Sequence, residues 1–158
     1  MSLPHVARIV SGGQTGADRA ALDWARNRGI DRAGWCPRGG LAEDHPDPPG
    51  VLAEHPLRET PDASYEQRTE WNVRDSDATL LLVLPGAHPT GGTALTLDLA
   101  RQHSRPHLLA GTDEAPAVRA WLSSLPDGSV LNVAGPREST APGIHAAVLA
   151  LLDEVADG

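Results

Sequence analysis

Residues 6–18 pass from an apolar run, through a glycine-rich turn, into a helical pattern. The turn reads Ser11-Gly12-Gly13-Gln14-Thr15-Gly16-Ala17-Asp18. Glycines let backbone N–H groups approach a ligand closely, and the start of the helix adds a positive dipole end. The turn therefore predicts a seat for a phosphate or a similar anion, with a tight strand–helix turn that binds nothing as the alternative.

Short apolar runs and helical patterns alternate along the rest of the chain. The predicted strands are residues 5–10, 33–36, 78–84, 107–110 and 130–134, with a short edge strand at 57–60. The predicted helices are residues 17–28, 65–75 (opened by the capping box Ser64-x-x-Gln67), one that starts within residues 89–93 and continues to about Gln102, one capped by Thr112 or Asp113, and 142–155. This alternation is typical of a three-layer α/β sandwich with a mainly parallel sheet of about five to seven strands. The length fits a single domain, 1–158.

Three polar turns follow predicted strands, those that end near Val10, Leu84 and Ala134. The second turn contains Gly91-Gly92-Thr93, and the third is residues 135–139. Because ligands bind outside the carboxyl ends of parallel strands, we expect the three turns to form one binding cleft at that edge of the sheet.

The first turn differs from two well-known phosphate motifs. Its glycines are spaced G-G-x-x-G, and the predicted second strand ends at Cys36-Pro37-Arg38 with no acidic residue for a ribose, so a nicotinamide dehydrogenase is not expected. The chain has no lysine, which excludes a P-loop. Arg38 offers a positive fork or is simply solvated, and Asp18 is either an acid of the first helical turn or an acceptor that faces a ligand.

The composition narrows the class of partner and the compartment. The formal net charge of −8 makes nucleic acid and anionic membranes poor partners. Cys36 is the only cysteine, so no internal disulfide can form, and no leader or membrane-spanning run is apparent; we expect a cytoplasmic protein. The seven histidines show no metal-ligand spacing, so no metal site is expected.

Residues 37–62 are rich in proline and glycine. Their spacing predicts neither a helix nor a central strand. A connection this long is either functional, for example a lid, or a surface insertion. The following polar helix is either exposed or lines the site, and its Trp71 is either a core residue or a cover for a flat ring.

Several of these motifs together resemble a known family. Residues 11–18, 34–39, 67–77, 91–93 and 131–139 are similar, in order and over nearly the whole chain, to the molybdenum carrier (molybdenum cofactor carrier protein) family. The resemblance implies a Rossmann-like fold, related to the lysine-decarboxylase-like (LOG) proteins and commonly oligomeric, here expected as a dimer or tetramer. It implies a cargo, the molybdenum cofactor (molybdopterin), whose phosphate fits the glycine turns and whose metal is carried by the cofactor itself.

On this basis the cofactor-binding residues are predicted together, with no catalytic residue and no metal ligand. They are Gly12, Gly13, Gln14, Thr15, Gly16, Asp18, Arg38, Arg68, Gly91, Gly92, Thr93, Arg137, Glu138 and Ser139.

A related family supplies a rival function. The cytokinin-activating nucleoside-monophosphate phosphoribohydrolases carry P-G-G-x-G-T-x-x-E, and Arg68 and Asp77 resemble their arginine and following acid. Here Thr96 stands where their catalytic glutamate is expected, and threonine cannot act as that carboxylate. If the protein is an enzyme, Arg68 with Glu70, or Asp98, would have to serve. A nucleotide-sensing module of the same fold is the third function considered, with a nucleoside monophosphate as ligand.

Overall fold

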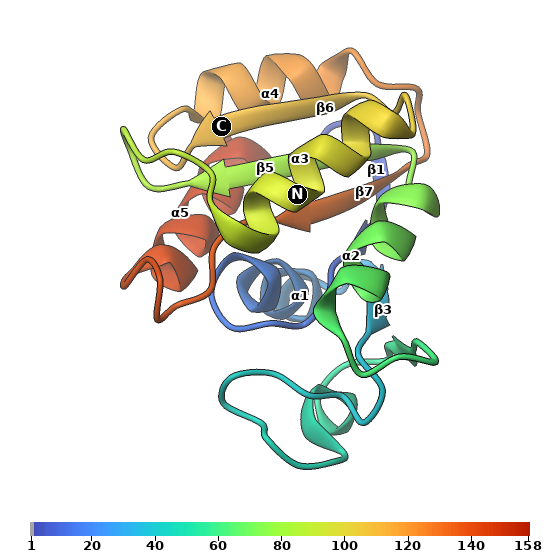
Figure 1. The fold of residues 1–158 in the computed structure, drawn as a ribbon. Helices are drawn as coiled ribbons and strands as arrows, with labels where there is room; N and C mark the ends of the chain where they lie inside the picture. Colours follow the sequence, from blue (N-terminus) through green and yellow to red (C-terminus); the bar gives the residue numbers. More distant parts are fainter. Residues whose placement is uncertain (1) are drawn as a thin grey trace.

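The computed structural model describes residues 2–158 as one α/β unit (Figure 1). Its elements are β1 (Val6–Val10), α1 (Ala17–Arg28), β2 (Asp31–Ala33), β3 (Trp35–Cys36), the 3-10 helix η1 (Gly50–Ala53), β4 (Arg58–Glu59), α2 (Tyr65–Arg74), β5 (Ala78–Val83), α3 (Gly91–Gln102), β6 (His107–Gly111), α4 (Ala115–Ser123), β7 (Ser129–Ala134) and α5 (Ile144–Asp157). The predicted three-layer α/β class is confirmed.

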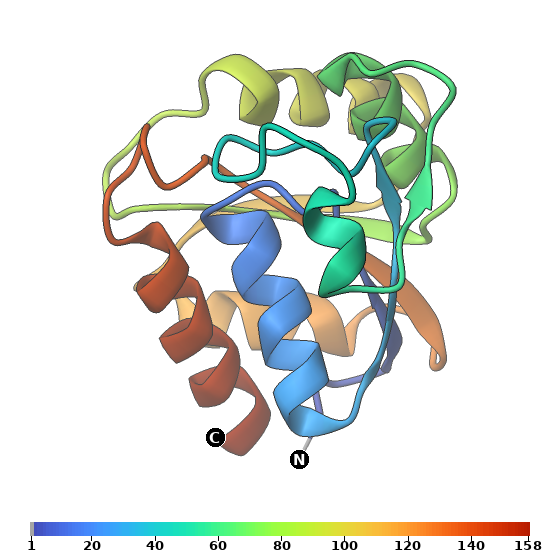
Figure 2. The ribbon, with the colours of Figure 1, turned by 90° about the horizontal axis from the view of Figure 1, so that it is seen from below.

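Five parallel strands form the main sheet, in the order β2-β1-β7-β5-β6. Figure 2 shows α2 and α3 on one side of this sheet and α1, α4 and α5 on the other. Counted from β7 as the first strand, the order reads 3-2-1-4-5, as in doubly wound nucleotide-binding folds. The last strand of the chain is therefore the central strand of the sheet.

Burial follows this layering. Every residue of β5 is buried, as expected for a parallel strand covered on both faces. The largest core cluster lies between the sheet and α1, α4 and α5, and it includes Ile144, Val148, Leu151, Leu152 and Val155 of α5, as the sequence predicted. A smaller cluster of Val73, Leu99 and Ala100 joins α2 to α3.

The predicted strand at residues 33–36 is wrong in one respect, because the chain breaks at Gly34 into two strands. Gly34 has φ +143°, and a Cβ there would lie 2.1 Å from the Ser11 carbonyl oxygen. β2 stays beside β1, whereas β3 leaves the main sheet and pairs with β4 in a separate two-stranded parallel sheet. The strand next to β1 thus ends at Ala33, not at Cys36.

Two helix starts differ from their sequence signals, and one short helix was not predicted. Ser64 is the N-cap of α2, but Gln67 Oε1 accepts the Asp62 N–H at 2.8 Å instead of completing a capping box. Glu114, rather than Thr112 or Asp113, is the N-cap of α4. Residues 37–62, expected to hold no helix, contain the four-residue η1.

Candidate functional site

A cavity of about 380 Å³ lies at the carboxyl ends of the central strands, where the sequence predicted a cleft. All three polar turns contribute to it. It is lined by Gly12, Gln14, Asp18, Tyr65, Glu66, Arg68, Thr69, Asn72, Thr90, Gly91, Gly92, Thr93, Leu95, Thr96, Asn132, Val133, Ala134, Gly135, Pro136, Arg137 and Thr140. Six consecutive lining residues, 132–137, come from the end of β7 and the turn that follows it. β7 lies where the strand order reverses, which is the position at which open α/β sheets bind ligands.

The first turn closes on a carboxylate of the protein itself. The backbone N–H groups of Gly12 and Gln14 hydrogen-bond to the Asp18 carboxylate. The Thr15 N–H donates to Gln14 Oε1 at 3.0 Å, and the Ala17 N–H donates to the Pro136 carbonyl oxygen at 3.2 Å. The backbone N–H groups that the sequence analysis expected to bind a phosphate therefore donate to acceptors within the protein.

Asp18 and Arg68 form a buried, oppositely charged pair in the wall of the cavity. Asp18 is 8% exposed and Arg68 is 6% exposed. Burial raises the pKa of the Asp18 carboxyl to about 6, against the opposing effects of Arg68 and of the backbone N–H donors. Burial also lowers the pKa of the Arg68 guanidinium, which Asp18 partly offsets. Arg68 Nη1 donates to the Gly12 carbonyl oxygen at 2.6 Å, which joins α2 to the first turn.

The second turn is open to the cavity. It begins α3, with Thr90 as the N-cap. Apart from chain neighbours and the backbone of the same helix turn, no heavy atom of residues 2–158 lies within 4 Å of the place a Cβ would take at Gly91 or Gly92. The first N–H groups of a helix have no acceptor within the helix and carry its positive dipole end. Thr93 lines the cavity as well and is 4% exposed. This turn is suited to an anion.

The third turn closes the cavity between the other two. A Cβ at Gly135 would lie 2.3 Å from the Leu82 carbonyl oxygen, so glycine allows β7 to end close against β5. Arg137 then brings a guanidinium to the cavity. The chain runs on into α5, whose first turn is capped by Glu138: its Oε2 accepts the Gly143 N–H at 2.7 Å, and its Oε1 accepts the His145 N–H at 3.1 Å.

The structure brings eight of the predicted binding residues to this cavity: Gly12, Gln14, Asp18, Arg68, Gly91, Gly92, Thr93 and Arg137. The others lie outside it and have other neighbours. Gly13 packs against Val51 and Leu57, and Gly16 packs against Pro136. The hydroxyls of Thr15 and Ser139 donate to Glu43, and Glu138 caps α5. Arg38 is exposed, beside Asp62. Glu70 lies in a second hollow between α2 and α3, next to His103.

Thirteen of the lining residues were not among the predicted ones, and three of them illustrate what the sequence could signal. Asn132 interrupts the apolar strand β7, and a buried polar residue in such a strand is a usable signal. Thr96 Oγ1 donates to the Gly92 carbonyl oxygen at 2.8 Å, so it faces the cavity from the second turn of α3. Thr140 gave no signal, because only the course of the chain after β7 brings it there.

The proline-rich segment, residues 37–62, buttresses the first turn and does not line the cavity. Glu43 accepts hydrogen bonds from the Thr15 hydroxyl and, at 2.5 Å, from the Ser139 hydroxyl. Arg19 of α1 donates to both carboxylate oxygens of Asp44 at 3.0 Å. Val51 and Leu57 pack with Leu22 and Cys36 in a cluster of their own. A lid over the cavity is therefore not what this segment forms.

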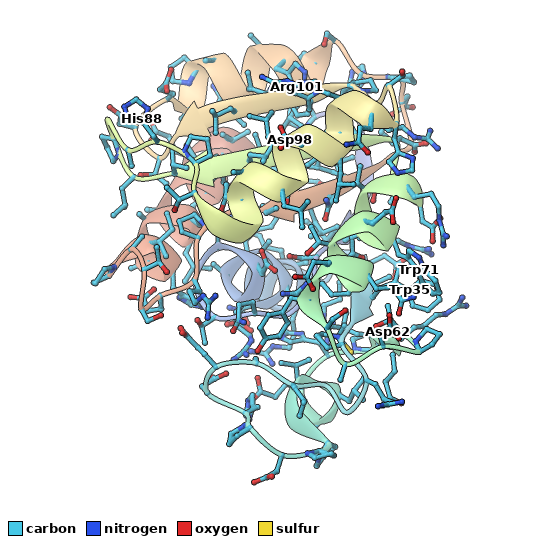
Figure 3. All side chains as sticks on the ribbon, viewed as in Figure 1. Trp35, Asp62, Trp71, His88, Asp98 and Arg101 are labelled. Carbon is cyan, nitrogen blue, oxygen red and sulfur yellow. The ribbon has the colours of Figure 1, made fainter. Side chains whose placement is uncertain are left out.

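Trp71 does not cover the cavity either. Figure 3 shows Trp71 and Trp35 together beside α2, and their ring centroids are 4.8 Å apart in an edge-to-face arrangement. Arg74 stacks over Trp71 at 4.7 Å. The contact between Trp35 and Trp71 attaches β3 to α2, so Trp71 is a packing residue.

Cys36 is buried, and burial raises the pKa of its thiol to about 11, which disfavours the reactive thiolate. Within residues 2–158, no group of three or more His, Cys, Asp or Glu side chains is arranged to hold a metal ion. The helices of this same part of the chain are all too short or too polar to cross a lipid bilayer.

The fold and the cavity define the class: a doubly wound α/β protein with its cavity at the switch point of the sheet. The sequence pattern of the circularly permutated YpsA SLOG family matches residues 9–156, and the chain belongs to that family. The strand order agrees with a permutation, because the doubly wound order appears when β7 is counted first. The resemblance found in the motifs is thereby confirmed at the level of the family.

One solved relative is similar over nearly its whole length. The crystal structure of a protein from Syntrophus aciditrophicus SB, named a putative molybdenum carrier protein, is 40% identical with a TM-score of 0.86, and the match covers 96% of each chain. Among curated proteins, no significant match is found.

Proposed function

We propose that this protein binds and carries a phosphorylated heterocycle, and that its cargo is the molybdenum cofactor. The observation that carries the proposal is the open start of α3, where Gly91 and Gly92 are uncovered in a cavity that Arg137 also lines. Helix N–H groups and an arginine are suitable donors for a phosphate. The name of the Syntrophus aciditrophicus relative supports the identity of the cargo.

The residues present fit this cargo in size and chemistry. A volume of about 380 Å³ is within the range of small-molecule pockets. The phosphate would lie at Gly91, Gly92 and Thr93 with Arg137 as its counter-charge, and the ring would fill the remaining space. The molybdenum would stay on the dithiolene sulfurs of the cofactor, so the cargo asks for no metal ligand from the chain.

We infer a carrier rather than a nucleotide hydrolase. Thr96 stands at the position where the phosphoribohydrolases are expected to have glutamate. Its hydroxyl donates a hydrogen bond to the Gly92 carbonyl oxygen. Glu70 pairs with His103 at 3.3 Å outside the cavity, and Asp98 pairs with Arg101 at 3.8 Å on the exposed face of α3 (Figure 3). Incubation with AMP should therefore release no adenine; steady release that Arg68→Ala abolishes would make the protein an enzyme.

The test of the cargo begins with protein purified without added ligand. It is denatured, and the released small molecules are identified by mass spectrometry; a molybdopterin species in stoichiometric amount is the expected result. Retention of added molybdenum cofactor is then compared between Arg137→Ala, expected to weaken it at least about tenfold, and Arg101→Ala, an arginine outside the cavity, expected to leave it unchanged. Equal retention by both variants, or none by the wild type, would overturn the proposal.

We further infer a cytoplasmic location and a homo-oligomeric state. The single, buried cysteine is compatible with a reducing compartment. The oligomeric state follows from the resemblance to a family whose members are commonly oligomeric.

A further inference from the structure

The two ends of the cavity differ in chemistry. At the start of α3, the uncovered Gly91 and Gly92 offer N–H donors, and Arg137 of the third turn adds positive charge to the cavity. At the first turn, the buried wall is the Asp18 carboxylate together with its partner Arg68. A phosphate there would compete with the Asp18 carboxylate for the Arg68 guanidinium in a poorly solvated place. With its phosphate at the start of α3, as proposed above, a phosphorylated ligand would direct its other end toward Asp18.

The Asp18 carboxylate is a hydrogen-bond acceptor, so the end of the ligand opposite the phosphate should carry hydrogen-bond donors. An ionised carboxylate offers about four lone-pair positions. The Gly12 and Gln14 N–H groups take two of these positions, and Arg68 supplies charge while its Nη1 donates to the Gly12 carbonyl oxygen. The acceptor positions that remain belong to a side chain that lines the cavity. Two remaining positions are the number needed for two parallel N–H bonds, the arrangement in which carboxylates are recognised most strongly.

We propose that Asp18 is a specificity-determining residue that accepts two N–H bonds from the amino-lactam edge of the bound ring, as presented by guanine and by pterins. This inference rests on the proposed function, because it uses the phosphate position at α3 to set the orientation. The amino-lactam edge carries a ring N–H next to an exocyclic NH₂, so both donors face the carboxylate together. Adenine presents a ring nitrogen lone pair beside its NH₂, and hypoxanthine presents the ring N–H alone.

The choice of a carboxylate at this position supports a ligand role. Asp18 is buried, and burial raises the pKa of its carboxyl to about 6, so near neutral pH it is ionised at a cost to the folded state. An asparagine would fill the same space without that cost. Residues that cost stability at the wall of a cavity are typical of functional sites.

The experiment measures the affinities of GMP, IMP, AMP and guanosine by calorimetry, near neutral pH and near pH 5. GMP should bind about 100-fold more tightly than AMP, with IMP between them, because AMP leaves the buried carboxylate facing a lone pair. GMP binding should weaken near pH 5, since protonated Asp18 loses one acceptor position and gains a donor that faces the ring N–H.

Two variants separate this role from a general effect. Asp18→Asn should reduce the GMP-to-AMP preference to a few-fold, whereas Asp98→Asn, the same change on the exposed face of α3, should retain it. Thermal unfolding checks that both variants fold; if Asp18→Asn does not, the ligand series and its pH dependence in the wild type decide alone.

The outcomes distinguish this inference from the proposed function. Equal binding of GMP and AMP, each much tighter than guanosine, would overturn the role of Asp18 and leave the phosphate site intact. Binding of GMP no tighter than that of guanosine would overturn the phosphate site and this inference with it.

Discussion

Asp18 is the residue at which stability opposes the proposed binding role. Folding raises the pKa of its carboxyl from 3.8 to about 6, so the folded state favours the protonated form. The stabilising contribution of protonated Asp18 is complete below about pH 4 and is lost as the pH rises through about 6. Near neutral pH the ionised carboxylate therefore lowers the free energy of unfolding.

Asp18→Asn removes this penalty. We expect the variant to exceed the wild type in free energy of unfolding by about 1–3 kcal/mol near neutral pH, with the difference shrinking toward zero between about pH 6 and pH 4. Urea unfolding of both proteins at a series of pH values measures this difference in free energy of unfolding. The contributions of the other titrating groups are the same in both proteins and cancel. Parallel pH profiles of the two proteins would contradict the expectation.

Gly16 and Gly92 are both turn glycines, but only one is needed for the backbone. Gly16 has φ +81°, and a Cβ there would lie 2.3 Å from the Pro136 carbonyl oxygen, whereas Gly92 is uncovered. Gly16→Ala should lower the free energy of unfolding by roughly 2–4 kcal/mol. Gly92→Ala should change it by less than about 1 kcal/mol, or raise it slightly through helix propensity. Denaturant titration measures the free energy of unfolding of both variants. Equal losses would contradict the expectation that a Cβ at Gly16 cannot be accommodated.

At the scale of elements, the proline-rich segment holds the first and third turns together. Glu43 joins Thr15 to Ser139, and the Glu138 N–H donates to Thr15 Oγ1 at 3.1 Å. These bonds connect the start of α1 to the chain that follows β7. The segment therefore supports the cavity wall from outside.

Glu43→Ala should loosen this support without unfolding the domain. We expect a loss of about 1 kcal/mol in the free energy of unfolding and faster amide exchange at Glu138 and Ser139, because the acceptor for Thr15 and Ser139 is gone. Hydrogen exchange followed by mass spectrometry measures this. Asp47→Ala, at an exposed carboxylate of the same segment, is the control and should leave exchange unchanged. Unchanged exchange in Glu43→Ala would mean that the core cluster under the segment suffices.

At the scale of the whole molecule, the permuted order places the third turn at the centre. β7 lies between β1 and β5, so the chain leaving β7 enters the crevice where strand order reverses. The first turn, one strand away, becomes a side wall. In the proposed function, the anion-binding role belongs to the start of α3, on the opposite side of β7.

The assembly is the prediction that belongs to this scale. We expect light scattering coupled to size exclusion to give twice or four times the 16.6 kDa of one chain. Tyr65 and Leu109 are the large hydrophobic side chains exposed among residues 2–158, and such side chains favour association. A mass of one chain throughout a concentration series would contradict the expectation.

The sequence by itself determined the alternation of strands and helices, the positions of the three turns and their meeting at one edge. These features depend on local periodicity and on the direction of the chain, which parallel pairing then converts into a common edge. The family resemblance also came from the sequence, since its motifs run in order along nearly the whole chain.

Tertiary structure alone decided which partner each polar group finds. The donors of the first turn meet Asp18, the chain breaks at Gly34 against Ser11, Glu138 turns to the start of α5, and Glu70 faces His103. Each outcome depends on atoms brought together from distant positions or by the exact course of a turn, which residue spacing does not encode. The sequence therefore predicted where the cavity lies, and the packing of the strands around β7 determined which side chains line it.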